Sequence, residues 1–254
     1  MSAVQAKKIN IVQAINMALH DAMELDSSVV VLGEDIADRE GGGVFKCTAG
    51  LSTKFGTGRV KSTPIAEQAI VGAAVGGALA GLRPVAEIML MNFTTVAMDQ
   101  IVNHAAKLRF MTGGQTHVPL VIRTTTGAGF GTGGQHADYL EAWFAHTAGL
   151  KVVAPSTPAD AYGLMLSCIF DDDPCIFIEN LPLYFVPGEA PVPGQRVPIG
   201  KARVVQEGSD ITLISYSKTL HEVIAVAKGL AKEGISAEVI DLRSLWPLDL
   251  DTLV

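Results

Sequence analysis

Two residues in this sequence combine a reactive side chain with an unusual setting. Glu67 follows Thr63-Pro64-Ile65-Ala66 and opens a segment made almost wholly of small residues. His136 follows a glycine-rich stretch at 129–134. A carboxylate in an apolar pocket can hydrogen-bond a ligand nitrogen, and a histidine in a mobile loop can move protons near neutral pH. These two residues are the first candidates for chemistry.

Both residues also allow a structural interpretation. With Thr63 as the N-cap of a helix and Pro64 as its first residue, the acid of a capping box would fall at Ala66. Glu67 misses that place by one residue, so a first-turn glutamate favoured by the helix dipole is the alternative. A lone loop histidine is usually solvated. Two other acids, Glu87 and Asp99, are expected to be solvated or structural.

The segment after Glu67 carries glycines and alanines at helical spacing. Gly72, Gly76, Gly77 and Gly81 recur among the alanines, although each interior glycine costs a helix about 1 kcal/mol relative to alanine. Such a helix is tolerable where another backbone packs closely against it. A buried helix within the chain and a helix at a subunit interface both satisfy this requirement.

Residues 129–134 match the G-x-G-x-x-G pattern of dinucleotide-binding turns. That site also needs an acid at the end of the next strand to hold a ribose, and the segment Val153-Ala154-Pro155-Ser156 contains none. A flexible loop whose glycines allow close approach of a ligand or subunit is the simpler interpretation. A P-loop is excluded, because no Gly-Lys-Ser/Thr sequence follows.

The composition argues against several classes of function. The chain has 254 residues, of which 48% are hydrophobic and 18% charged, and its formal net charge is −7. Nucleic-acid binding would need clustered Lys and Arg instead. The longest apolar run, 69–82, is shorter than the ~20 residues of a membrane span. No secretory signal is visible, so we expect a soluble protein. Three cysteines without C-x-x-C spacing (Cys47, Cys168 and Cys175) fit a reduced, cytoplasmic location.

Short apolar runs alternate with helical patterns over the first 180 residues. Strands are predicted over 29–32, 84–89, 119–123, 151–154 and 175–178, and helices over 11–25, 67–82, 94–111, 139–146 and 158–170. Near-continuous apolar strands separated by helices indicate an α/β fold, in which helices cover both faces of a parallel sheet.

A proline-rich segment, 181–200, predicts a linker after a first domain at 1–180. Strand, helix and strand patterns at 211–216, 220–232 and 237–241 then begin a second α/β unit, 201–254. Two or three strands are few for an independent domain. The end at Val254 therefore suggests a truncated chain.

Several segments, taken in order, match one family. They are Gly33-Glu34-Asp35, Thr63-Pro64-Ile65-Ala66-Glu67, Gly81-Leu82-Arg83-Pro84, Asn92-Phe93, Gln135-His136, Gly149-Leu150-Lys151-Val152-Val153 and Asp241-Leu242-Arg243-Ser244. Together they resemble the beta subunit of the thiamine-diphosphate-dependent decarboxylase component of 2-oxoacid dehydrogenase complexes, of the pyruvate, branched-chain 2-oxoacid or acetoin type. The resemblance covers essentially the whole chain. It implies a transketolase-like pyrimidine-binding domain followed by the start of a transketolase C-terminal domain.

The resemblance also implies roles for single residues. Glu67 matches the glutamate that hydrogen-bonds the aminopyrimidine of thiamine diphosphate, and His136 matches a histidine that handles protons during acyl transfer to a lipoyl group. Four positions match residues near the cofactor: Glu34, Ile65, Met89 and Phe93. An alpha subunit would hold the diphosphate and its Mg²⁺, and this sequence has no Gly-Asp-Gly motif of that kind. The implied assembly is an α2β2 heterotetramer that passes its product to a lipoyl-bearing acyltransferase.

A structural potassium site of some family members is matched by five positions, mostly through backbone carbonyls. They are Leu120, Cys168, Ile169, Asp171 and Asp173, the last standing where some members have Asn. A solvated acidic helix end is the alternative for 171–173.

Two residues depart from the family pattern. Ala66 and Ala137 stand where serines are usual, so each position has lost a hydroxyl rather than a reacting group. Three functions stay open: a catalytic beta subunit acting on a 2-oxoacid or acetoin, a nicotinamide- or flavin-binding oxidoreductase using 129–134, and a non-catalytic assembly partner. The retention of Glu67 and His136 favours the first.

Overall fold

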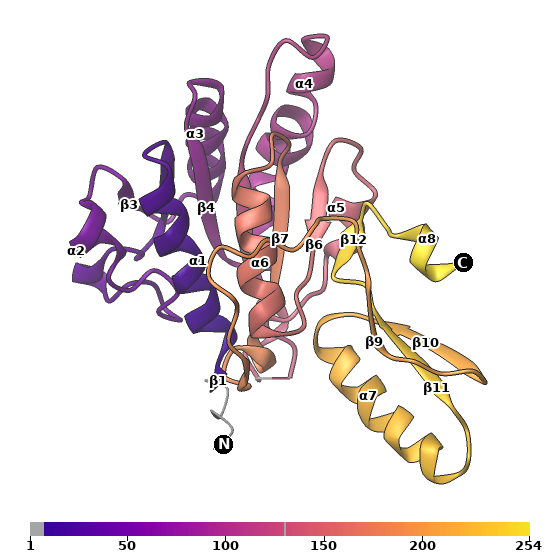
Figure 1. The fold of residues 1–254 in the computed structure, drawn as a ribbon. Coiled ribbons are helices and arrows are strands. Elements are labelled where there is room, and N and C mark those ends of the chain that lie inside the picture. The colour runs from indigo at the N-terminus through magenta and orange to yellow at the C-terminus, as the bar shows by residue number, and fades with distance from the viewer. Residues whose placement is uncertain (1–7, 130) are drawn as a thin grey trace.

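The computed structural model describes residues 8–129 and 131–254, which form a larger and a smaller part (Figure 1). The larger part is built on a seven-stranded sheet with the order β12-β6-β7-β5-β4-β2-β3. All neighbouring pairs are parallel except β12 and β6. Its strands are β2 (Val29–Glu34), β3 (Val60–Thr63), β4 (Arg83–Leu90), β5 (Val121–Thr126), β6 (Lys151–Val153), β7 (Cys175–Asn180) and β12 (Ser244–Trp246). The expected α/β fold with a mainly parallel sheet is confirmed.

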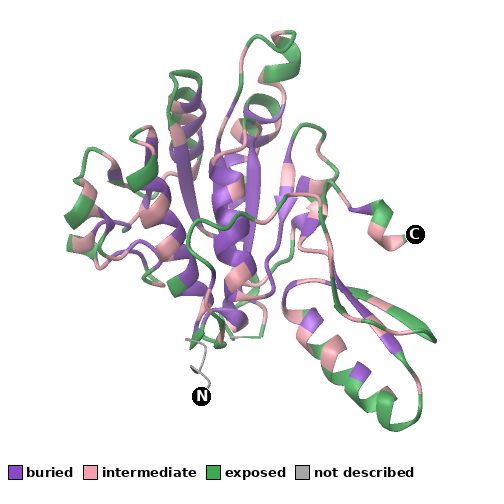
Figure 2. Cartoon of the chain, in the orientation of Figure 1, coloured by how far each residue is buried: buried purple, intermediate pink, exposed green. Residues whose placement is uncertain are grey.

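Helices cover both faces of this sheet, and the strands between them are buried (Figure 2). One face packs against α1 (Ile11–Leu25) and α6 (Pro158–Ile169). The other face packs against α3 (Glu67–Leu79), η2 (Met91–Ala97), η3 (Gln100–Ala105) and α5 (Glu141–Ala145). The buried apolar residues accordingly form two large clusters, one on each side of the sheet.

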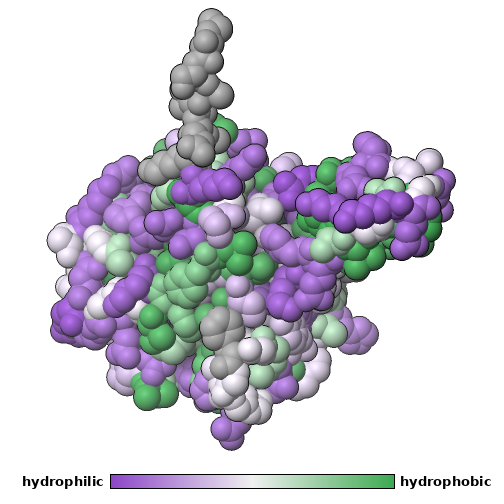
Figure 3. Space-filling model, turned by 90° about the horizontal axis from the view of Figure 1, so that it is seen from below, coloured by the Kyte–Doolittle hydropathy of each residue, from purple (hydrophilic) through white to green (hydrophobic). Residues whose placement is uncertain are grey.

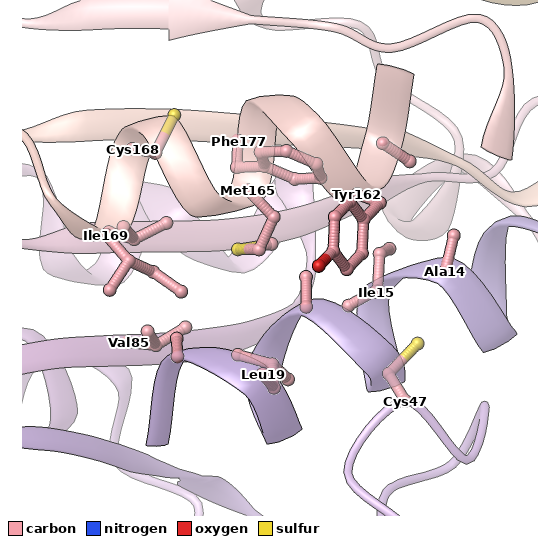
Figure 4. Close-up of a cluster of buried hydrophobic side chains, with 14 of the residues drawn as sticks. Ala14, Ile15, Leu19, Cys47, Val85, Tyr162, Met165, Cys168, Ile169 and Phe177 are labelled. Atoms are coloured by element: carbon pink, nitrogen blue, oxygen red, sulfur yellow. The ribbon is translucent and has the colours of Figure 1, made fainter. Parts of the chain in front are cut away.

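The contact between α1 and α6 shows how the sequence builds one of these layers. A capping box between Asn10 and Gln13 starts α1. In the close-up, the side chains of Ile15 and Leu19 face those of Tyr162 and Met165 on α6 (Figure 4). Burial of such apolar side chains contributes roughly 1.5–3 kcal/mol each, so this helix pair is a rigid support behind the sheet.

Shorter elements connect the layers. They are η1 (Asp38–Glu40), α2 (Leu51–Phe55), α4 (Leu108–Met111), η4 (Gly134–His136), η5 (Leu181–Leu183) and the antiparallel pair β1 (Lys8–Ile9) and β8 (Gly188–Glu189). The segment expected to be a linker thus contains η5 and β8, and β8 pairs with the start of the described chain.

The smaller part has a three-stranded sheet with the order β10-β11-β9. Its elements are β9 (Arg203–Gln206), β10 (Ile211–Ser215), α7 (Ser217–Lys232), β11 (Ala237–Asp241) and α8 (Leu250–Leu253). Between β11 and α8 the chain returns to the larger part, where β12 pairs with β6. Arg203 and Arg243 reinforce the junction, because both form ion pairs with Asp160 of α6.

Two helix predictions need correction. The helix expected over 94–111 is divided into η2, η3 and α4, and the wide turn of η3 ends with Ala106 donating to the carbonyl of Ile101. The helix after β3 begins at Glu67 with Ala66 as its N-cap, so Thr63 is not the cap. Thr63 instead ends β3, where it pairs with Glu34 in the parallel ladder. Sheet pairing outweighed the local capping preference.

Among the residues that the structure describes, no helix has the length and apolar character that crossing a bilayer requires.

Candidate active site at the carboxyl edge of the sheet

The residues expected to carry chemistry gather where the parallel strands end. Glu34 is the last residue of β2, Glu67 opens α3 just after β3, and Met89 lies near the end of β4. Phe93 follows in η2 and His136 in η4, after β5. In open α/β sheets, ligands bind in the crevice outside the carboxyl ends of the strands. The topology therefore brings together residues that are far apart in the sequence.

This end of the molecule is partly apolar. Viewed from below, toward the end where β7 leads into η5 and β8, the surface shows a hydrophobic area within a largely hydrophilic surround (Figure 3). Ile65, between β3 and α3, is 78% exposed, and Phe185, just after η5, is 63% exposed. A continuous exposed apolar area, unlike single exposed side chains, is typical of a binding surface.

Two carboxylates form the first half of the site. Glu34 and Glu67 are both half-buried, and the ladder between β2 and β3 places Glu34 opposite Thr63. Burial raises the pKa of Glu34 above its usual value, and the negative charges of Glu67 and Asp35 add to this effect. Two neighbouring acidic groups of this kind can bind a ligand group that carries a proton.

The start of α3 leaves the carboxylate of Glu67 available to a ligand. Within 8–129 and 131–254, no side chain caps the helix at Ala66, so its first-turn amides have no capping acceptor. Glu67 lies in that first turn, where the helix dipole stabilises its negative charge. The carboxylate is held at the mouth of the helix and not within a capping box.

An aromatic pocket forms the second half. A β-bulge between Ile88 and Leu90 interrupts the pairing of β4 with β5, and bulges of this kind re-aim side chains next to active sites. The rings of Phe93 and His136 meet edge to face with their centroids 5.4 Å apart. An adjoining pocket of about 520 Å³ is lined by residues that include Asn92, Phe93, Gln135, Asp138, Leu140 and Trp143.

Beneath the site lies a buried ionic network that the sequence analysis missed. Arg123 of β5 donates two hydrogen bonds to the carboxylate of Glu179 on β7, at 2.8 and 2.7 Å, and also pairs with Glu87 of β4. The hydroxyl of Tyr184 bonds both Glu179 and Thr125. The network ties three central strands together just below their carboxyl ends.

The buried groups of this network shift one another's pKa values. Burial raises the pKa of Glu87 above its usual value, although Arg123 opposes the effect. Burial disfavours the charged form of Arg123, but Glu179 and Glu87 more than compensate and raise its pKa. Burial also raises the pKa of the Cys47 thiol to about 12, so this cysteine is an inert neighbour. Of the two expectations for Glu87, the structural role is confirmed.

A sequence signal for the network existed. Glu87, Arg123 and Glu179 interrupt strands that are otherwise nearly continuous apolar runs. A charge in a strand buried on both faces must pair with another charge, so three such residues on neighbouring strands predict a buried cluster.

The five residues matched to a potassium site lie at the other end of the sheet. Leu120 precedes β5, and the segment from Cys168 to Asp173 joins α6 to β7. Arg83 donates to the carbonyls of Ile169 and Asp171, at 3.1 and 3.0 Å. Lys151 binds the carboxylate of Asp171 at 2.6 and 2.7 Å and lies 3.3 Å from that of Asp173. In this structure, Arg83 and Lys151 therefore bind carbonyl and carboxylate oxygens at the positions matched to the potassium site.

The glycine loop at 129–134 does not resemble a dinucleotide site in its surroundings. It leads into η4, a single turn at Gly134–His136, whereas a pyrophosphate site uses the start of a full helix. Its described part instead carries His136 toward Phe93.

Comparison with known proteins identifies the family of both parts of the chain. Residues 7–186 match the family described as transketolase, pyrimidine binding domain, and residues 200–254 match the transketolase C-terminal domain. The fold also resembles that of a split-gene transketolase in an inactive beta4 tetramer, with a TM-score of 0.78, 23% identity, and coverage of 96% of this chain and 75% of that one.

Relatives at higher identity are beta subunits. The acetoin:2,6-dichlorophenolindophenol oxidoreductase subunit beta of Cupriavidus necator is 46% identical over 98% of this chain and 76% of its own length. The 2-oxoisovalerate dehydrogenase subunit beta of Bacillus subtilis is 44% identical over 96% and 74%. The mitochondrial pyruvate dehydrogenase E1 component subunit beta-1 of Oryza sativa subsp. japonica is 44% identical over 98% and 67%. The chain therefore belongs to the transketolase-like family that contains the beta subunits of 2-oxoacid and acetoin dehydrogenase systems.

Proposed function

We propose that this chain is the beta subunit of a thiamine-diphosphate-dependent 2-oxoacid dehydrogenase, active together with an alpha subunit. The observation that carries the proposal is the placement of Glu67, half-buried beside Glu34 at the uncapped start of α3. The names of the relatives support the class of reaction. Acetoin is the alternative substrate, favoured by the relative from Cupriavidus necator.

The donor set fits the pyrimidine half of the cofactor. Such a ring needs a carboxylate for its nitrogen and apolar neighbours for its faces. Glu67 supplies the carboxylate, and Ile65, Met89 and Phe93 supply apolar surface at the same edge of the sheet. When bound, thiamine diphosphate supplies the electron sink for the loss of CO₂ from a 2-oxoacid.

Each site residue then has a distinct task. Glu67 would accept a hydrogen bond from the pyrimidine nitrogen of the bound cofactor and so favour its protonated form. Glu34 adds a second acidic group beside Glu67, and burial raises its pKa above the usual value. His136, against Phe93, donates a proton during transfer of the acyl group to a lipoyl acceptor.

The remaining parts of the proposal concern partners and location. An alpha subunit holds the diphosphate and Mg²⁺ in an α2β2 assembly, and a lipoyl-bearing acyltransferase receives the product. A cytoplasmic location fits three buried free cysteines. A potassium ion at the Leu120 and 168–173 positions is also proposed, and it would compete with Arg83 for the carbonyls of Ile169 and Asp171.

The test is Glu67→Gln in the complex reconstituted with the alpha subunit. Thiamine-diphosphate-dependent turnover is measured with pyruvate, branched-chain 2-oxoacids and acetoin. Loss of a positioned proton acceptor should lower kcat by roughly 10²–10⁴-fold.

Glu222→Gln is the control, because Glu222 is exposed and, within the described part of the chain, forms a single ion pair, with Lys218 one helical turn away. Such surface pairs contribute about 0–1 kcal/mol, so activity should be unchanged. Near-normal decarboxylation by the Glu67→Gln complex would refute the role of Glu67.

A further inference from the structure

We propose that Asn92 and Asp138 are positioning residues, which form a clasp that holds His136 against Phe93. Asn92 directly precedes Phe93 in η2, and Asp138 lies two residues after His136. The functional meaning of the clasp rests on the proposed role of His136. The hydrogen bonds that form the clasp are present in the structure whatever the role of His136.

The clasp is a reciprocal pair of hydrogen bonds. The Asn92 amide Nδ2 donates to the Asp138 carboxylate, and the backbone N–H of Asp138 donates to Asn92 Oδ1 at 3.3 Å. A charged acceptor makes the first bond stronger than a neutral one. One asparagine therefore holds both the side chain and the backbone of Asp138.

Further contacts hold the same segment. The Thr126 hydroxyl at the end of β5 donates to the carbonyl of Asp138 at 2.9 Å. Two residues on, the backbone N–H of Leu140 lies 3.0 Å from the sulfur of Met91. The carboxylate and backbone N–H of Asp138 are thus fastened to the segment after β4, and its carbonyl to the end of β5.

The loop needs such a fastening because it is rich in glycine. Gly129, Gly131 and Gly133 have φ of +96°, +69° and +84°, and glycine loses more conformational freedom on ordering than other residues. Closer to the histidine, the Thr132 hydroxyl approaches the His136 carbonyl at 3.4 Å, a long contact. The clasp therefore ties the end of this loop, next to His136, to the segment that carries Phe93.

Gly127 shows how closely the histidine backbone is seated. A Cβ added at Gly127 would lie 2.6 Å from the carbonyl oxygen of His136. The backbone of His136 is thus packed against the end of β5 while Asp138 is held by Asn92. Phe93 is held by its own packing in η2, next to Asn92, so the pair of hydrogen bonds seats His136 at the 5.4 Å ring contact.

The chemistry of the pair allows a swap experiment. Asn92→Asp places two carboxylates together and should open the clasp by repulsion. Asp138→Asn removes the charge from the stronger bond. The double variant Asn92→Asp/Asp138→Asn restores a donor amide opposite a carboxylate, which can also accept the backbone N–H of residue 138. Asp210→Asn is the matched control, because its carboxylate also accepts a backbone N–H, at 2.7 Å from Ser236, but lies in the smaller part.

Two steps are measured separately in the reconstituted complex: decarboxylation with an artificial electron acceptor, and acyl transfer to free lipoamide. A misplaced His136 should lower kcat of acyl transfer roughly 10–100-fold in Asn92→Asp, with KM for the 2-oxoacid and decarboxylation within about threefold. The double variant should recover most of the loss. Amide hydrogen exchange at 134–140 should speed up in Asn92→Asp and return toward the wild-type rate in the double variant.

The outcomes separate the clasp from the proposed function. Unchanged exchange and unchanged transfer in Asn92→Asp would overturn the clasp, while wild-type turnover leaves the function standing. An equal fall in both steps without recovery in the swap would also overturn it, because that pattern indicates general damage. A wild-type complex without thiamine-diphosphate-dependent turnover would refute the function, and the exchange rates would still decide whether the clasp exists.

Discussion

Single residues at this site are understood through the charges they face. Glu34, Glu67 and Glu87 are three acids near one edge of a sheet, yet their surroundings differ. Glu87 is buried against Arg123, whereas Glu34 and Glu67 are half-buried and close enough for the charge of Glu67 to act on Glu34. The first arrangement stabilises the fold, and the second leaves carboxylates available to a ligand. Residue type alone does not distinguish the two cases.

Arg123 provides a prediction at this scale. Arg123→Met leaves the carboxyls of Glu87 and Glu179 buried without their cation, which should lower the free energy of unfolding in urea at pH 7 by about 3–5 kcal/mol. The deficit should shrink at lower pH, because uncompensated buried carboxyls take up protons.

Arg39→Met serves as the control for this change. Arg39 is largely exposed and pairs with its neighbour Glu40, so its loss should change stability by less than about 1 kcal/mol. An Arg123→Met protein as stable as the wild type would show that the buried network contributes nothing.

At the scale of elements, close backbone contacts determine where helices and loops can lie. Gly149, before β6, has φ of +101°, and a Cβ there would lie 1.9 Å from the carbonyl oxygen of Ala106. Ala106 follows the wide turn of η3, where the expected continuous helix is broken. The end of the interrupted helix therefore packs directly against the backbone of Gly149.

Gly149→Ala tests that contact. Left-handed backbone costs a non-glycine residue about 1–2 kcal/mol, and the overlap with Ala106 adds about 1–3 kcal/mol of overpacking. The free energy of unfolding in urea should therefore fall by about 2–5 kcal/mol. Gly113→Ala is the matched comparison, since Gly113 also has positive φ, at +65°, but open space around its Cβ position. Equal losses in the two variants would show that backbone strain alone is responsible.

At the scale of the whole molecule, the larger and smaller parts are joined by buried carboxylates and the arginines that pair with them. Asp241 at the end of β11 is fully buried and accepts a hydrogen bond from Ser156 at 2.9 Å. Burial, and then the nearby carboxylate of Asp160, raise the pKa of Asp241 from 3.8 to about 6. Arg203, 3.4 Å away, opposes this shift. The junction therefore contains a group that titrates in a mildly acidic range.

This shift predicts how stability depends on pH. Between pH 4 and 6 the folded state holds a proton on Asp241 that the unfolded chain has released, so the contribution of this group to stability falls as pH rises. Asp241→Asn cannot titrate. From pH 4 to pH 7, the difference in unfolding free energy between variant and wild type should move in favour of the variant by up to about 3 kcal/mol. Urea unfolding at several pH values measures this difference. Asp251→Asn is the control, because the side chain of Asp251 is 94% exposed. A difference that is flat with pH would contradict the buried, raised carboxyl.

The sequence by itself determined the fold class, most element positions and the two leading candidate residues. Apolar runs at β2, β4 and β7 follow directly from burial on both faces of a parallel sheet, and the order of short motifs indicated the family. Local patterns also predicted a helix near Glu67, although its first residue depended on how far β3 pairs with β2.

Only the tertiary structure decided which side chains meet. The contact of Phe93 with His136, the clasp between Asn92 and Asp138, and the pairing of Arg83 with the carbonyls of Ile169 and Asp171 join residues from separate loops. Such contacts depend on strand order and on the exact ends of strands. Those features are set by the packing of the whole sheet and not by neighbouring residues, which is why Glu67 and His136 could be named in advance but their partners could not.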